Sequence, residues 1–403
     1  MEAVSRKVVY RMYPSHRQSA MLLDALGLHQ RLYNAALEQR ITSWRTQLKG
    51  ISLGEQSRDL TELRAEFPEY AGLNAQSSQV TLKRLDLAFQ AFFRRVKSGE
   101  TAGFPRFKSF ERFSGWGYKT HGDGFRFVPG DGFRHGKLRL SGIGVIPVRG
   151  RARTSGETAT CEIQRKGARW YASFTIKCEP RRERGTQAVG LDWGVETFAT
   201  LAHEDETFSA VENPRFVREA KAKLEAASQV LALKKRGSKR RKKAVCVIAE
   251  IHRRTANKRR DFLHKTSAAL VVSTDLIATE SLTVGGMTRS ARGTVENPGR
   301  NVAQKAGLNR EILSTAPSAF LAMLRYKAAE AGSKFVEINA RKVKPSQTCS
   351  DCGRQRKKSL SERRHACECG CNLSRDENGA RVNLLWAFAQ FRREPPERLS
   401  RYA

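Results

Sequence analysis

The sequence lacks any run of about eighteen apolar residues, the length that a helix needs to cross a membrane. Residues 1–14 also lack the apolar segment of a secretory signal peptide, so we expect a cytoplasmic protein. Cysteine is scarce, with eight residues, and a reducing compartment argues against a disulfide framework. The isolated Cys161, Cys178 and Cys246 lie in apolar or mixed segments and are expected to be buried thiols. These absences exclude a membrane-spanning protein and a disulfide-stabilised secreted one.

Acidic residues are also in short supply. The 403 residues contain 40 Asp and Glu against 74 Lys and Arg, which gives a formal net charge of +34. Such a surplus repels itself unless a polyanion neutralises it, and the basic residues run through every region instead of forming one tail. We therefore expect salt-sensitive binding of nucleic acid, on the nucleoid of a bacterial cytoplasm, with an anionic membrane surface as the lesser alternative.

The first half of the sequence alternates between strand and helix patterns. Residues 5–12 alternate as a strand does, and residues 15–98 repeat apolar residues at helical spacing, with one helix expected over 78–97. From 118 to 180, short strands separated by glycines predict a small β-barrel or sandwich. We expect strand 5–12 to join this β unit, so that the helical block is an insertion in it.

The second half predicts an α/β unit with a long basic arm. Residues 188–192 and 198–202 indicate a hairpin, and a buried strand ends at Glu280. The remaining expected elements are a basic helical pair over 214–267, a mobile segment over 283–307, a helix over 318–332, a strand over 335–339 and a closing helix over 377–391. The whole chain is thus expected to be an α+β multidomain protein.

Basic side chains concentrate in one predicted turn of this arm, where eight of the ten positions 234–243 are Lys or Arg. A flexible solvated tip explains such a run, but the overall charge favours a clamp on RNA or DNA. The candidate contacts are Lys234, Lys235, Arg236, Lys239, Arg240 and Arg241. In the segment GFPRFK, Arg106 and Lys108 can contact phosphates, or the loop can be anchored in the core by Phe104 and Phe107.

Three carboxylates occupy positions that favour chemistry. Asp192 and Glu280 each end an apolar β segment, and ligands bind at strand ends in open α/β sheets. Asp376 lies beside the start of the last helix and can reach the same edge, although singly it can also be a helix cap. Three converging carboxylates repel one another unless divalent metal is bound, and two magnesium ions suit phosphodiester hydrolysis.

A cysteine cluster precedes Asp376. Cys349 and Cys352 form a C-x-x-C pair, and a second group of cysteines about fifteen residues later strengthens the zinc signal. The second group is HACECGC, so Cys367, Cys369, Cys371 and His365 compete for the two remaining positions. Four protein ligands leave no open position on zinc, which predicts a structural ion that positions Asp376 and contacts nucleic acid.

The segments around the three acids resemble a known family. GLDWGVETFATL, TESLTV and CECGCNLSRDENGARVNL are similar to the split RuvC-like nuclease of TnpB proteins, which insertion sequences encode. The resemblance continues in VVYRMYPSHRQ, RLDLAFQAFFRRVKSG, GFPRFKS and PSQTCSDCG, in the family's order. TnpB proteins hold a transposon-end RNA and cut DNA that pairs with it beside a short flanking motif, and they are regarded as ancestors of type V CRISPR effectors.

The resemblance implies roles for residues. Asp192, Glu280 and Asp376 would be the catalytic magnesium ligands, and the family's spacing to Asp376 selects Cys367 and Cys369 as the zinc pair. Ser57, Gln76, Gln79 and Lys83 would face outward and read the flanking motif, although such residues are more often plain surface. The expected partners are guide RNA and double-stranded target DNA, bound by a monomer with one RNA.

The resemblance also implies a domain order. It comprises a β-barrel wedge domain that grips the RNA scaffold (1–14 and 118–182), a helical recognition lobe (15–117), an RNase H-like RuvC nuclease domain (183–345 and 374–391), a zinc-binding insertion (346–373) and a flexible tail (392–403).

Three other functions compete with a TnpB nuclease. A miniature type V CRISPR effector would share its fold and site. A guided DNA-binding repressor would have lost at least one acid, and all three are present. A transposase that joins strands itself is the fourth hypothesis, and the resemblance argues against it.

Overall fold

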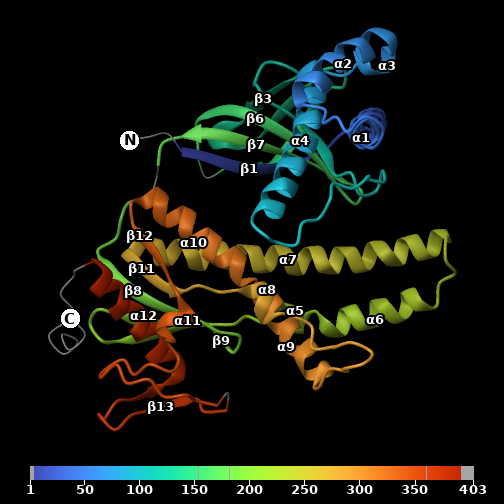
Figure 1. Ribbon diagram of the computed structural model, residues 1–403. Coiled ribbons are helices and arrows are strands. Elements are labelled where there is room, and N and C mark those ends of the chain that lie inside the picture. Colours follow the sequence, from blue (N-terminus) through green and yellow to red (C-terminus); the bar gives the residue numbers. More distant parts are fainter. Residues whose placement is uncertain (1–3, 153, 181, 360, 392–403) are drawn as a thin grey trace. The chain divides into compact units, whose positions relative to one another are not determined.

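The computed structural model describes residues 4–152, 154–180, 182–359 and 361–391 (Figure 1). The chain divides into two compact units, Met1–Pro180 and Arg181–Ala403, which are described separately. The tail predicted over 392–403 lies outside the described residues. Among the residues that the structure describes, no helix has the length and apolar character to cross a membrane.

The helices of the first unit begin where polar caps stand in the sequence. Ser15 and Ser52 each accept a backbone N–H and form a reciprocal capping box with the third helical residue. Asn74 caps the next long helix, which therefore begins three residues before the predicted position 78. The four helices are α1 (His16–Gln47), α2 (Leu53–Glu66), α3 (Pro68–Ala71) and α4 (Ala75–Lys97).

One curled antiparallel sheet of seven strands forms the rest of the first unit, in the order β2-β6-β7-β1-β5-β4-β3. The first strand pairs with β7 and β5, which confirms that strand 5–12 joins the later β segments. The sheet comprises β1 (Val4–Met12), β2 (Gly115–Tyr118), β3 (Phe125–Pro129), β4 (Arg134–Leu140), β5 (Gly144–Arg151), β6 (Glu157–Lys166) and β7 (Arg169–Cys178), with a short 3₁₀ turn over Asp131–Phe133. Its buried side chains pack with those of α1, α2 and α4 in one core.

The second unit contains a five-stranded sheet in the order β10-β9-β8-β11-β12. Here β8 pairs antiparallel with β9 and parallel with β11, and β11 pairs parallel with β12. The strands are β8 (Gln187–Trp193), β9 (Thr197–His203), β10 (Phe208–Glu212), β11 (Thr274–Glu280) and β12 (Lys334–Ile338). The predicted hairpin and both predicted strands that follow it are confirmed.

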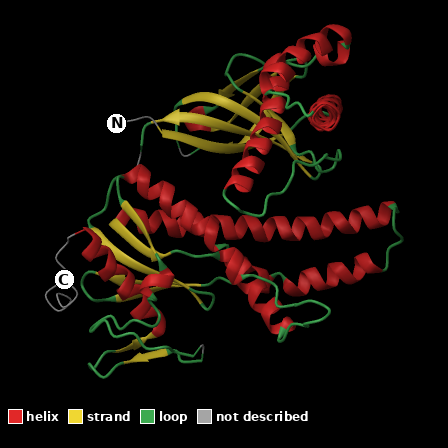
Figure 2. Ribbon diagram, viewed as in Figure 1, coloured by secondary structure: helices red, strands yellow, loops and turns green. Residues whose placement is uncertain are grey.

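Helices cover this sheet on both faces (Figure 2). Successive residues of a strand point to opposite faces, so Ala188 packs with the last helix, α12, while Val189 and Leu191 pack against α7 and α10. The helices are α5 (Phe216–Glu219), α6 (Lys221–Ala232), α7 (Lys239–Ser273), α8 (Val284–Met287), α9 (Val302–Thr315), α10 (Pro317–Ala331), α11 (Ala340–Val343) and α12 (Arg375–Phe391). A small hairpin of β13 (Arg364–Ala366) and β14 (Asn372–Ser374) precedes α12.

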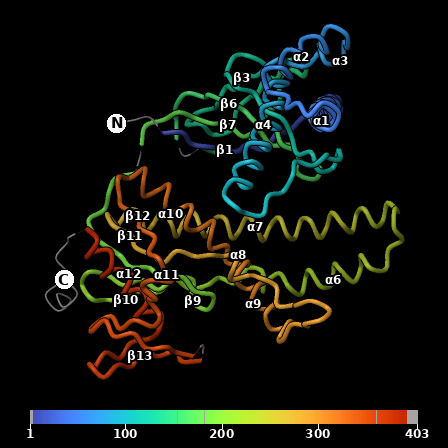
Figure 3. Tube along the Cα trace, viewed as in Figure 1, coloured from blue at the N-terminus to red at the C-terminus, as the bar shows by residue number. Residues whose placement is uncertain are grey.

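The predicted basic helical pair is present, and α6 runs beside α7 (Figure 3). Its turn is shorter than expected, because Ser238 caps α7 and residues 239–243 are already helical. Part of the segment 283–307, expected to be mobile, is helical in α8 and α9. Lys305 of α9 donates a hydrogen bond to the carbonyl of Met287 at 2.6 Å.

One prediction about isolated cysteines was wrong. Cys161 and Cys178 are buried as expected, but Cys246 is exposed. It lies in the part of α7 that extends away from the sheet, and the buried residues of that helix begin only at Leu263. An apolar neighbourhood in the sequence therefore did not imply burial.

Candidate functional site

Two of the predicted acids lie side by side at the carboxyl edge of the five-stranded sheet. Leu191 of β8 is the register partner of Thr279 in the parallel strand β11. Asp192 and Glu280 follow directly on these partners and point to the same face. The parallel pairing thus brings together two carboxylates that are far apart in the sequence.

Asp376 reaches the same edge from α12, which packs on β8 and β9. Two glycines allow this helix to approach closely. A Cβ on Gly190 would lie 2.0 Å from the carbonyl oxygen of Ala380, and one on Gly379 would lie 3.1 Å from Oδ2 of Asp192. Because neither glycine has a side chain, the first turn of α12 lies against the end of β8.

The start of α12 is capped by its neighbours and not by Asp376. The hydroxyl of Ser374 accepts the N–H of Glu377 at 3.1 Å, and the Glu377 carboxylate accepts the N–H of Ser374 at 2.8 Å. This reciprocal capping box satisfies the helix terminus. Ser374, and not Asp376, is therefore the N-cap of α12.

The electrostatics of these acids favour a cation. Asp192 and Glu280 are half-buried. Burial raises the pKa of Asp192 above its ordinary value, and the charges of Glu280 and Asp376 raise it further. Burial likewise raises the pKa of Glu280. A hard divalent ion that prefers carboxylate oxygens would offset this repulsion, so the three residues fit magnesium.

The four cysteines predicted to bind zinc meet at one point. The sulfur atoms of Cys349 and Cys369 are 3.6 Å apart, as are those of Cys352 and Cys367. All four sulfurs lie within 4.8 Å of one another. Thiolates 2.3 Å from a tetrahedral zinc ion are about 3.8 Å apart, so these residues fit zinc.

The protonation of one thiol also suits a metal ligand. A hydrogen bond from the backbone N–H of Cys369 lowers the pKa of Cys367 to about 7. The thiolate is the form that binds metal. Cys367 is therefore prepared to lose its proton near neutral pH.

The rival ligands form a second group around the same cysteine. His365 and Cys371 each place a ligand atom within 4.8 Å of Cys349, and all three residues are buried. His365 Nδ1 is in contact with the amine of Lys358, and the Cys371 sulfur lies 3.7 Å from the Ser350 hydroxyl. This second group has three residues, whereas the four cysteines supply the four ligands that a tetrahedral zinc site needs.

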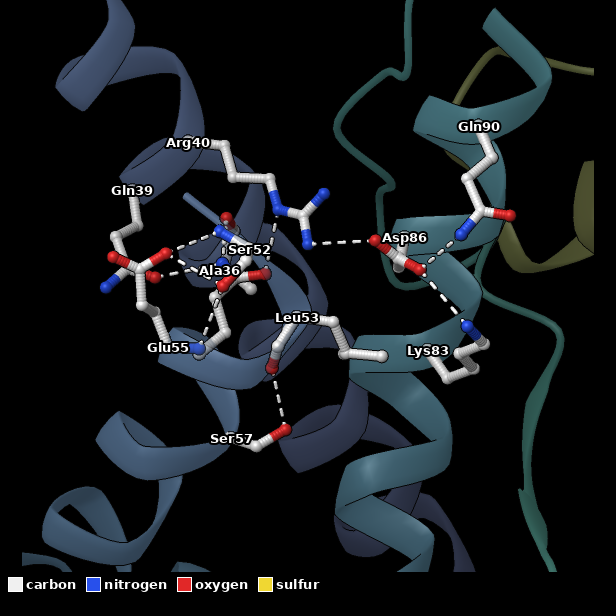
Figure 4. Close-up of polar contacts among 11 residues, drawn as sticks. Ala36, Gln39, Arg40, Ser52, Leu53, Glu55, Ser57, Lys83, Asp86 and Gln90 are labelled. Atoms are coloured by element: carbon white, nitrogen blue, oxygen red, sulfur yellow. Dashed lines mark hydrogen bonds and ion pairs between the residues drawn. The ribbon is translucent and has the colours of Figure 1, made fainter. Parts of the chain in front are cut away.

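Two of the expected motif readers, Ser57 and Lys83, make polar contacts within the first unit (Figure 4). The Ser57 hydroxyl donates to the carbonyl of Leu53 at 2.8 Å, so it is occupied within its own helix. The amine of Lys83 lies 3.2 Å from Asp86, which also pairs with Arg40 from α1 at 3.4 Å. Lys83 is exposed, whereas Ser57 is half-buried.

The other predicted readers are half-buried too. Gln79 accepts a hydrogen bond from the Lys119 amine at 3.0 Å. The side-chain oxygen of Gln76 is buried and finds no hydrogen-bond partner among the described residues. The structure therefore groups these residues on α2 and α4, with only Lys83 fully at the surface.

The loop around GFPRFK is not held in the core as one alternative expected, because Phe107 is 51% exposed. Phosphate contact by Arg106 or Lys108, the other alternative, stays a prediction. Phe104 packs edge-on against Phe92 at 5.3 Å, yet it is 47% exposed, so it is only partly anchored. Arg106 is exposed. The amine of Lys108 lies 4.6 Å from the centre of the Tyr33 ring, in a cation–π contact.

Four of the six candidate contacts in the basic turn of the arm are exposed. Lys235, Arg236, Lys239 and Arg240 face solvent, while Lys234 and Arg241 are half-buried. Arg241 donates to the carbonyls of Leu231 at 3.0 Å and Lys234 at 3.2 Å, which satisfies the end of α6. Arg241 thus has a structural role in closing the helical pair.

Two buried asparagines of α12, Asn378 and Asn383, were not singled out by the sequence reasoning. Both are polar residues in the buried face of an otherwise apolar helix, and buried amides need hydrogen-bond partners. An asparagine on the apolar face of a predicted helix was therefore the feature of the sequence that could have identified both residues.

Family models match two parts of the chain. A model described as a probable transposase, OrfB_IS605, matches residues 160–291, and a Cas12f1-like TNB domain matches residues 318–383. A Streptomyces pristinaespiralis protein provisionally named an RNA-guided DNA endonuclease is 32% identical, over 96% of this chain and 90% of that protein. The Escherichia coli K12 protein InsQ, with the same provisional description, is 30% identical over 94% of this chain and 91% of its own.

A solved structure shares the fold. The protein of a Cas12f1–sgRNA–target DNA complex superposes with a TM-score of 0.61 at 12% identity, over 94% of this chain and 99% of that chain. The mixed α and β architecture is therefore that of a known fold.

Proposed function

The chain belongs to the TnpB family, and from that premise we propose that it is an RNA-guided DNA endonuclease. In this proposal it holds a guide RNA from the transposon end and cuts complementary DNA beside a short flanking motif. The observation that supports this proposal most directly is that Asp192, Glu280 and Asp376 lie together at one edge of the sheet. The net charge of +34 supports nucleic acids as the partners.

The three acids would hold two magnesium ions. When bound, these ions supply an activated water and stabilise the leaving oxygen of a phosphodiester. The chain's own contribution is geometric: β8 and β11 hold two carboxylates in register, and α12 adds the third from above the sheet edge. The raised pKa of Asp192 and Glu280 means that metal must compete with protons at this site.

In this proposal the two units have different roles. The five-stranded sheet with α12 would be the RNase H-like RuvC nuclease domain, over 183–345 and 374–391. The curled sheet of strands β1 to β7 would grip the RNA scaffold, and the helices α1 to α4 would recognise the guide and target duplex. One zinc ion on Cys349, Cys352, Cys367 and Cys369 would stabilise the insertion 346–373, in a monomer with one RNA.

Cleavage by the purified ribonucleoprotein tests this proposal. The chain is expressed with its flanking transposon DNA, the co-purifying RNA is sequenced, and a plasmid that matches the RNA is incubated with magnesium. We expect wild-type protein to cut and Asp192→Ala to bind RNA without cutting. Asp205→Ala is the matched control, because Asp205 lies in the β9–β10 turn, where it accepts hydrogen bonds from Thr207 of the same turn. Equal cutting by all three proteins would exclude the assigned site.

A further inference from the structure

Asn378 hydrogen-bonds α12, the helix that carries Asp376, to the loop 345–350, which contains Cys349 and is called the cysteine loop. Its amide nitrogen donates to the carbonyls of Thr348 at 2.7 Å and Pro345 at 3.2 Å, and its oxygen accepts the N–H of Ser350 at 3.0 Å. The side chain is fully buried. The backbone groups that it binds flank Cys349 on both sides, so one side chain of α12 holds the first cysteine of the cluster.

These three bonds explain why the residue is an asparagine. A neutral amide supplies two donors and one acceptor region, and the loop offers two carbonyls and one N–H. Aspartate is similar in shape but presents only acceptors to the two carbonyls, and leucine satisfies none of the groups. Each buried polar group left without a partner costs about 1–3 kcal/mol.

The opposite face of the same helix contacts the sheet edge. Gly379, the next residue, lies against Asp192, and the Asn383 amide donates to the carbonyl of Leu191 at 2.9 Å. Asp376 itself is two residues before Asn378, in the first turn. The first two turns of α12 are therefore held from one side by the cysteine loop and from the other by β8.

We propose that Asn378 is a positioning residue that couples the cysteine cluster to the acidic site. When the cluster holds its metal, the loop 345–350 is ordered and fixes α12 through Asn378, so Asp376 stands opposite Asp192 and Glu280. When the cluster loses its metal, the loop no longer fixes the helix, and the acidic site binds divalent ions more weakly. This inference rests on the proposed function, since it takes both groups of residues as metal sites.

Coupling of this kind is reciprocal and can be measured without cleavage. If occupancy of the cysteine cluster strengthens binding at the acids by some factor, binding at the acids strengthens zinc retention by the same factor. The probe for the acids is Mn²⁺. The concentration of free Mn²⁺ is measured by electron paramagnetic resonance. The probe for the cluster is the equilibrium zinc occupancy at fixed concentrations of a competing chelator, measured with and without Mn²⁺.

The experiment compares the full chain before and after zinc removal. In wild-type protein we expect zinc removal to weaken Mn²⁺ binding by about tenfold, within the usual range of coupling between sites. In Asn378→Ala the zinc-loaded protein should already bind Mn²⁺ weakly, and zinc removal should change the affinity less than about twofold. Asn378→Asp, which keeps the shape and removes the donors, is measured in parallel in case the alanine variant does not fold.

Asn383→Ala is the matched control, because Asn383 is equally buried on the same helix but contacts β8 and not the loop. It should weaken Mn²⁺ binding in both states and keep the tenfold effect of zinc. A tenfold zinc effect in the Asn378 variants, or none in wild-type protein, would overturn the coupling. If wild-type protein shows no guided cutting, or if Asp192→Ala does not reduce Mn²⁺ binding, the proposed function itself is refuted.

Discussion

Gly379 lies directly against Asp192, and a Cβ placed on the glycine would stand only 3.1 Å from the carboxylate oxygen Oδ2. This distance is shorter than an ordinary van der Waals contact, so any side chain at position 379 displaces either the carboxylate or the helix. The absence of one methyl group thus decides where two elements of the candidate site meet.

Gly379→Ala should therefore lower the rate of DNA cutting by about tenfold, equivalent to about 1.4 kcal/mol, through displacement of Asp192. Single-turnover cleavage by the variant ribonucleoprotein measures this. Gly307→Ala in α9 is the control, since a Cβ at that position meets no atom within 4 Å. Equal rates for wild type and Gly379→Ala would show that the contact is not critical.

The cysteine geometry predicts which thiol is dispensable for zinc. Cys369→Ser should lose the bound zinc ion, because a structural site needs four ligands. Cys371→Ser should keep it, since the Cys371 sulfur lies outside the four-cysteine set. Metal content of the purified proteins decides the matter, and the reverse pattern would select Cys371 as a ligand.

Asp86 should matter for the stability of the first unit. It pairs with Arg40, whose side chain is only 9% exposed, and also accepts from Lys83 and Gln90. Asp86→Ala leaves the largely buried Arg40 charge without this partner, so we expect the free energy of unfolding in urea to fall by about 2 kcal/mol. Gln90→Ala removes one exposed hydrogen bond and should change stability by less than about 0.5 kcal/mol. Equal effects would contradict this assignment.

His29 should make folding sensitive to acid. It is buried against Trp116, with its ring nitrogens bonded to Thr81 and Ser77. Burial, aided by the charge of Arg84, lowers its pKa to about 3. The unfolded chain protonates His29 near pH 6.5. Below that pH the unfolded state therefore binds more protons, and stability falls by up to about 1.4 kcal/mol per pH unit.

The comparison with His29→Gln isolates this contribution. Both proteins contain the same carboxylates, so the difference in their unfolding free energies reports His29. Wild-type protein should lose stability more steeply than the variant between pH 6 and pH 4. Parallel curves would show that the histidine is protonated in the folded state.

Local patterns in the sequence predicted most elements but not their assembly. Strands such as β7 alternate strongly and were predicted, whereas β2 was missed because its sequence GWGY is half glycine. A Cβ on Gly115 of β2 would lie 1.8 Å from the carbonyl oxygen of Ile163, so pairing with β6 requires the residue that weakens the strand pattern.

The same limit applies to the site. Asp192 and Glu280 could be proposed because each ends a buried strand, and parallel register then brings them together. Asn378 could not be assigned its partners, because these are backbone groups of a loop some thirty positions earlier in the chain. Hydrogen bonds to a distant backbone leave no periodic signal in a sequence.

The most direct test of the central claim is an exchange of guides. Two preparations of the ribonucleoprotein differ only in the guide end of the RNA, and each is incubated with magnesium and two plasmids that match one guide each. We predict that each preparation cuts only the plasmid that pairs with its own guide. Cutting of both plasmids by both preparations, or of neither, would contradict RNA-guided cleavage.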